Sequence, residues 1–116
     1  MGPLLPFIAS GCLAILAASN AAAETRTELV EKGHAILEAK CARCHAIGKD
    51  DTSKHREAPP FREVVKRYPP DNLAEALAEG IMSGHPDMPE FVFQPPEIEA
   101  IVRYLGTLVP VKAMAN

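Results

Sequence analysis

One short segment of the chain has residue types and spacing that suit a specific chemistry. It reads Cys41-Ala42-Arg43-Cys44-His45. Two thiols three residues apart on a helical turn can each add to one vinyl group of a haem, while the adjacent imidazole reaches the iron. The segment therefore predicts one c-type haem, attached covalently through Cys41 and Cys44, with His45 as the first axial ligand.

Three other uses of these residues compete with haem attachment. A structural zinc site would need further ligands to complete a tetrahedron. A thioredoxin-like redox pair should begin a helix after a strand, whereas this pair ends a predicted helix in a chain without a strand pattern. A disulfide between Cys41 and Cys44 would leave His45 without a role. Haem attachment accounts for all three residues and is the preferred interpretation.

The second face of a haem iron needs a ligand, and Met88 is the preferred candidate. It occupies an apolar loop between Pro86 and Pro89, and chain stiffened on both sides presents a side chain at a fixed point. A thioether stabilises ferrous over ferric iron, so a His/Met pair raises the reduction potential. Met88 could instead fill a gap in the core. Met82 and His85 are the other candidate ligands, and ligation by His85 would lower the potential.

The N-terminus has the pattern of an export signal. Residues 4–18 are largely apolar and uncharged, residues 19–23 are small, and Glu24 follows. This predicts a signal peptide over residues 1–23, a mature domain over residues 24–116 and a periplasmic location, where bacteria attach c-type haem. The first six residues lack Lys and Arg, so the signal is atypical or the true start lies upstream. The alternative is an uncleaved membrane anchor, although the run is shorter than the roughly 20 residues that span a bilayer.

Composition limits the class of partner and the kind of core. The 12 Lys and Arg and the 15 Asp and Glu residues leave a net charge of −3, which argues against nucleic acid as a partner. The chain is long enough for one small domain, but it has no Trp, only four Phe and two Tyr. So few large side chains make a thin core unless a bulky apolar group, such as a haem, completes it.

Helical periodicity predicts helices over four segments and no strand. The first runs from Arg26 to Lys40 and begins at a capping box made by Thr25 and Glu28. A surface loop that contains His55 follows over residues 46–60. The second predicted helix covers residues 61–68 and buries Phe61, Val64, Val65 and Tyr68. The third is capped by Asp71 or Asn72 and stopped by Gly80, and its inward residues are Leu73, Ala74, Leu77 and Ala78.

An apolar loop over residues 81–94 leads to the last predicted helix, which Pro95-Pro96 opens and which ends before Pro110. Its apolar stripe consists of Ile98, Ile101, Val102, Leu105 and Leu108.

From Gly33 to Tyr104 the chain resembles the class I monohaem cytochromes c of small bacterial type. The haem motif carries most of this resemblance, and the segment from Gly84 to Phe91 carries the rest. The resemblance implies a small all-α fold of three to five helices around one covalent haem. It also implies that the first and last helices cross at Gly33, with Tyr104 packed there.

The same resemblance implies a role for each residue of the site. Cys41 and Cys44 correspond to the thioether positions, His45 to the proximal ligand and Met88 to the distal ligand. In this family a proline carbonyl accepts the N–H of the proximal imidazole, which fixes the ring. That proline corresponds to Pro59, with Pro60 as the alternative.

An iron with both axial positions filled by protein exchanges electrons and has no site for a substrate. We therefore expect a periplasmic one-electron carrier, not an enzyme, whose partners are a membrane respiratory complex or dehydrogenase and a terminal acceptor. The alternatives are a haem subunit of a larger dehydrogenase or oxidase system, and a ligand-binding or catalytic haem protein in which Met88 is labile. The residues that could form a positive rim for partners, or simply a solvated face, are Lys49, Lys54, Arg56, Arg62, Lys66 and Arg67.

Overall fold

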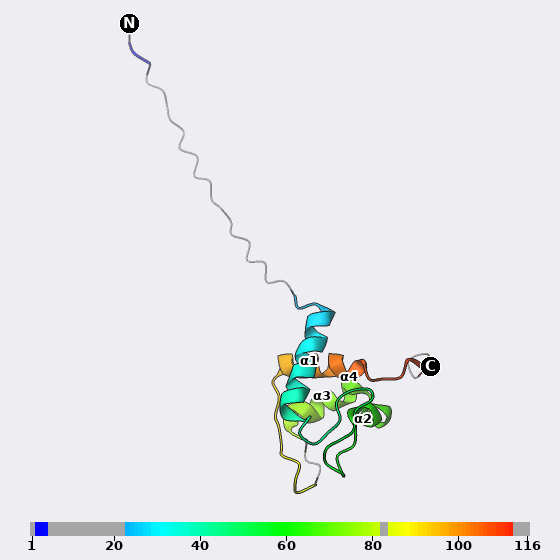
Figure 1. Ribbon diagram of the computed structural model, residues 1–116. Helices are drawn as coiled ribbons and strands as arrows, with labels where there is room; N and C mark the ends of the chain where they lie inside the picture. Colours follow the sequence, from blue (N-terminus) through cyan, green and yellow to red (C-terminus); the bar gives the residue numbers. More distant parts are fainter. Residues whose placement is uncertain (1, 5–22, 82–83, 113–116) are drawn as a thin grey trace.

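The described part of the chain is built from four helices. The computed structural model describes residues 2–4, 23–81 and 84–112. In these residues it contains α1 (Arg26–Lys40), α2 (Phe61–Arg67), α3 (Pro70–Glu79) and α4 (Pro95–Gly106), and no strand (Figure 1). The all-α prediction is confirmed. None of the described helices is long and apolar enough to cross a membrane. Most of the predicted signal segment, with Cys12, lies outside the described residues, and so does Met82.

The crossing of α1 and α4 is the main helix contact of the fold (Figure 1). A capping box starts α1, as predicted: the Glu28 amide donates to Thr25 Oγ1 at 3.2 Å, and Glu28 Oε2 accepts from the Thr25 amide at 2.7 Å. Gly33, in the middle of α1, lies against α4. A Cβ at this position would overlap the carbonyl of Ala100 and come within 2.8 Å of Tyr104 Cβ. Only glycine lets the two backbones approach this closely.

The core lies between α4 and the other elements. Ile101 has no exposed surface, and it belongs to a buried cluster with Leu37 of α1, Val65 of α2 and Leu77 of α3. Phe93, just before α4, joins the same cluster. The predicted stripe of α4 is buried at Ile98, Ile101 and Leu105 but only half-buried at Val102, and Leu108 is buried beyond the helix end.

The start of α3 and two inward positions differ from the prediction. No side chain caps α3, because Pro69 is its N-cap and Pro70 occupies the first turn. Proline has no amide to satisfy and its φ suits a helix start, so α3 begins ahead of the predicted caps, Asp71 and Asn72. Tyr68 is 57% exposed because α2 ends at Arg67, and Ala78 of α3 is also exposed.

Tyr104 connects the helix crossing to the segment that follows the haem motif. Its hydroxyl donates a hydrogen bond to the carbonyl of Ile47 at 2.7 Å, and its ring meets His34 edge to face at 5.1 Å. Ile47 and Ala46 are themselves buried, so the predicted surface loop begins inside the core. Burial, with a smaller contribution from the negative charge of Asp51, raises the pKa of Tyr104 above its ordinary value of 10.0.

The close approach at Gly33 predicts a large effect of one added methyl group. Gly33→Ala should lower the free energy of unfolding by about 3 kcal/mol, because the methyl group meets rigid backbone rather than a flexible side chain. Gly106→Ala, at the end of α4, is the matched control, since a Cβ there meets nothing within 4 Å. Urea denaturation of the three proteins measures the difference. Equal midpoints for the two variants would show that α1 and α4 do not approach closely at Gly33.

The raised pKa of Tyr104 predicts how its contribution to stability depends on pH. Above the ordinary tyrosine pKa the unfolded chain releases a proton that the native hydroxyl still holds, so the native state loses stability as pH rises. The advantage of the unmodified protein over Tyr104→Phe, about 1 kcal/mol, should be complete below pH 10 and shrink above it. Urea titrations of both proteins from pH 8 to pH 11 test this. A difference that does not vary with pH would contradict it.

Candidate haem site

The cysteine pair lies on a turn that continues α1. Cys41 is the C-cap of α1, and its carbonyl accepts hydrogen bonds from the amides of Cys44 at 3.1 Å and His45 at 2.9 Å. This turn brings two half-buried free thiols and the imidazole together over five residues. Burial, and then the charge of Cys44, raise the pKa of Cys41 to about 11. The Cys41 side chain is therefore a neutral thiol at physiological pH.

The imidazole of His45 is held by one hydrogen bond and one ring contact. Its Nδ1 lies 2.8 Å from the carbonyl oxygen of Pro59, and its ring stacks on Phe61 with centroids 4.8 Å apart and planes 21° apart. A proline carbonyl can only accept, so Nδ1 carries the proton. The lone pair of the ring is then on Nε2, the nitrogen that would bind a metal.

Helix geometry explains why Pro59 rather than Pro60 makes this hydrogen bond. Pro60 is the N-cap of α2, and its carbonyl accepts from the amides of Glu63 at 2.9 Å and Val64 at 3.1 Å. The carbonyl of Pro59 lies before the helix and accepts no hydrogen bond from its first turn, so it accepts the hydrogen bond from His45. The roles of His45 and Pro59 toward a haem stay predictions.

Asp51 organises the chain between the haem motif and Pro59. Its carboxylate accepts from the amides of Ile47 at 3.1 Å and Gly48 at 2.9 Å, while its carbonyl accepts from Arg62 of α2 at 2.7 Å. The Ala46 carbonyl accepts from the amide of Phe61 at 2.9 Å. These contacts place Phe61 beside the imidazole. The sequence pattern did not indicate that Asp51 or Phe61 belongs to the site.

Met88 lies at the end of a tight turn. The amide of Met88 donates to the carbonyl of His85 at 3.2 Å, with Pro86 at the second turn position that proline favours. Met88 is half-buried. His85 is also half-buried, and its Nε2 lies 2.7 Å from Glu57 Oε2. The ligand role of Met88 stays a prediction.

Two contacts with the end of α3 anchor the loop that carries Met88. The amide of Phe93 donates to the Leu77 carbonyl at 3.0 Å. Gly80 ends α3 with a φ of 97°, and the side chain of Glu90 passes over its Cα, where a Cβ would overlap the carboxylate. The positive φ favours glycine there, as the predicted helix stop at Gly80 anticipated.

The described residues fit an apolar group with a metal at its centre. No charged side chain among them is buried, and the one buried side chain with a polar group is Tyr104, whose hydroxyl is hydrogen-bonded to Ile47. Several apolar side chains pack against the core but stay half exposed, among them Ala42, Phe61, Leu73, Ala74, Ile81 and Phe91. Two thiols for attachment to the porphyrin, and an imidazole and a thioether as iron ligands, are the groups that a covalent haem uses. A haem would cover apolar surface and displace no buried polar contact.

Comparison with known proteins places the chain in a family. The model of the family described as cytochrome C oxidase, cbb3-type, subunit III matches residues 28–105. No curated protein and no solved structure gave a significant match. The matched residues run from the first turn of α1 to the last turn of α4 and include the cysteine pair, His45 and Met88. The chain therefore belongs to this family of c-type cytochrome domains and is a monohaem cytochrome c.

Proposed function

We propose that the chain is a one-electron carrier that works outside the cytoplasm. Its haem is bound covalently through Cys41 and Cys44, with His45 and Met88 as axial ligands. The bound haem supplies an iron that cycles between the ferric and ferrous states. Membership in a family of c-type cytochrome domains supports electron transfer as the general role.

The observation that carries the proposal is the fixed orientation of His45. The 2.8 Å contact of Nδ1 with Pro59 and the stacking on Phe61 hold the ring in one orientation. Such a hydrogen bond selects the tautomer and raises the basicity of the ligating nitrogen. A ring held in this way loses little entropy on binding and keeps its position in both iron oxidation states, which suits fast electron exchange.

A basic hollow supports the proposed contact with an acidic redox partner. The hollow has a volume of about 330 Å³, lies beside the end of α4, and is lined by Lys49, Arg62, Lys66 and residues 107–111. Three of the six residues of the expected positive rim therefore gather at one place, where Arg62 also pairs with Asp51 and Lys66 with Glu63. Charge complementarity of this kind speeds encounter more than it tightens binding, as a transient electron-transfer contact requires.

A second candidate function is a haem subunit of a larger oxidase. The description of the matched family, a subunit of a cbb3-type oxidase, favours it. Both functions use the same closed haem and differ in whether the partner dissociates. Co-purification with a large membrane complex would favour the subunit, and a monomer in solution that turns over with many partners would favour the carrier.

Removing the distal ligand should open the iron. Met88→Ala should keep covalent haem but lose the far-red methionine-to-iron band, bind carbon monoxide when reduced and shift to a lower potential, because the thioether favours ferrous iron. Met114→Ala, outside the family match, is the control, and Met82→Ala tests the other methionine. Visible spectra of the oxidised, reduced and carbon monoxide-treated proteins measure this. Ready carbon monoxide binding by the unmodified protein would instead favour the ligand-binding alternative.

The covalent attachment is tested separately. Cys41→Ala should leave at most one thioether bond, because only one thiol remains in the motif, and Cys12→Ala should leave both. Mass spectrometry of the denatured protein and the haem α-band wavelength distinguish one bond from two. Two intact bonds in Cys41→Ala would contradict the attachment proposed here.

A further inference from the structure

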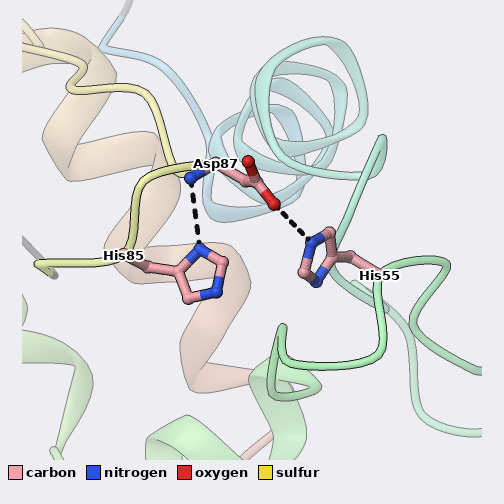
Figure 2. Close-up of side chains that lie close together, drawn as sticks. All are labelled: His55, His85 and Asp87. Carbon is pink, nitrogen blue, oxygen red and sulfur yellow. Dashed lines mark hydrogen bonds and ion pairs between the residues drawn. The ribbon is translucent and has the colours of Figure 1, made fainter.

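Two short segments with the same pattern lie in the two loops of the haem site. His55-Arg56-Glu57 belongs to the loop that leads to Pro59, and His85-Pro86-Asp87 belongs to the loop that carries Met88. In each segment the amide of the acidic residue donates to Nδ1 of the histidine two residues earlier, at 3.1 Å for Glu57 and 3.2 Å for Asp87. Figure 2 shows the second of these bonds, from Asp87 to His85. Both rings are thus oriented by their own backbone.

The two segments bind each other crosswise. Nε2 of His55 lies 3.2 Å from Oδ2 of Asp87, and Nε2 of His85 lies 2.7 Å from Oε2 of Glu57 (Figure 2 shows the first pair). The two rings meet edge to face with centroids 5.4 Å apart. Each histidine therefore contacts the carboxylate of the opposite segment, and we call these four residues the reciprocal clamp.

The hydrogen bonds decide between a clamp and a metal site. One donor atom each from His55, His85 and Asp87 lies within 4.8 Å of the others, a spacing that could hold a metal ion. However, both Nδ1 atoms accept amide protons, so the ring protons are on the Nε2 atoms that point to the carboxylates. A metal at Nε2 would move each proton to Nδ1 and break both amide hydrogen bonds. The geometry therefore favours hydrogen bonding over metal binding.

The clamp joins the two sides of the haem site. The amide of His55 donates to the Cys44 carbonyl at 3.0 Å, and Glu57 is two residues before Pro59, the acceptor for His45. At the other end, Asp87 directly precedes Met88, whose amide donates to the carbonyl of His85. The His55–Asp87 and Glu57–His85 pairs thus each connect the segment between Cys44 and Pro59 to the turn of Met88.

We propose that the reciprocal clamp positions the Met88 turn and keeps Met88 bound to iron. The inference rests on the proposed His/Met ligation. The side chains of His55 and His85 are 29% and 32% exposed, and those of Asp87 and Glu57 are 66% and 65% exposed. Pairs this exposed add little to global stability. They instead raise the free energy of locally opening the loop that carries Met88, which can occur without global unfolding.

The test is the rate at which imidazole replaces Met88 in the ferric holoprotein, since entry requires the loop to open. Glu57→Ala and Asp87→Ala should each raise this rate by about three- to tenfold, and the double variant should raise it further. Glu57→Gln keeps an acceptor oxygen and should lie between Glu57→Ala and the unmodified protein. Glu99→Ala is the matched control, because it removes an exposed carboxylate that pairs with Arg103 on α4.

Each outcome has a distinct meaning. Faster entry in both clamp variants, with partial rescue by Glu57→Gln and no effect of Glu99→Ala, supports the clamp. Imidazole entry at the same rate as in Glu99→Ala would overturn the clamp, and so would a lowered thermal midpoint without faster entry. In both cases a far-red band in the unmodified holoprotein would still support His/Met ligation. Absence of that band in the unmodified holoprotein would overturn the ligand assignment and the clamp together.

Discussion

The close contact of Gly33 with the backbone of α4 is the constraint on which the rest of the structure depends. It sets where α1 lies, and the haem motif follows directly from the last turn of α1. It also sets where α4 presents Tyr104, whose hydroxyl holds the carbonyl of Ile47 just beyond the motif. One helix crossing therefore positions the cysteine pair from both sides, before any contact of the haem is considered.

From that crossing the two axial sides of the site are held in different ways. The His45 side of the site is held by contacts around Asp51, Pro59 and Phe61, in which backbone amides and carbonyls are the main partners. The loop that carries Met88 is attached to the end of α3 through Gly80 and Phe93. It then contacts the loop before Pro59 through half-buried histidine and exposed carboxylate side chains. Backbone contacts are hard to change one at a time, whereas side-chain contacts are easily changed. The loop that carries Met88, the proposed distal ligand, is therefore the more easily adjusted half of the site.

The features predicted from sequence are those with local causes. The capping box of Thr25 and Glu28, the prolines that open α4 and the glycine that stops α3 act within a few residues, and the structure has each element where the pattern indicated. The misplaced cap of α3 had a local cause too, since Pro70 competes with Asp71 for the helix start. The contacts of Asp51 with Arg62 and of His55 with Asp87 were not predicted, because they join segments whose proximity depends on the fold. A repeated His-x-acid pattern was the available signal, but the pattern alone does not say which carboxylate each ring meets.

The thin core explains why the site and the fold depend on each other. Among the described residues no charged side chain is buried, and Tyr104 is the one buried side chain with a polar group. The half-exposed apolar groups include Phe61 beside His45 and Phe91 after Met88. Covering apolar surface contributes about 25 cal/mol per Å², so a haem-sized group that covers these side chains adds a stabilising term that small domains otherwise lack. The same burial lowers the local dielectric around the iron and strengthens the effect of each ligand on its potential. A haem in contact with these side chains would therefore draw folding energy and redox tuning from the same apolar contacts.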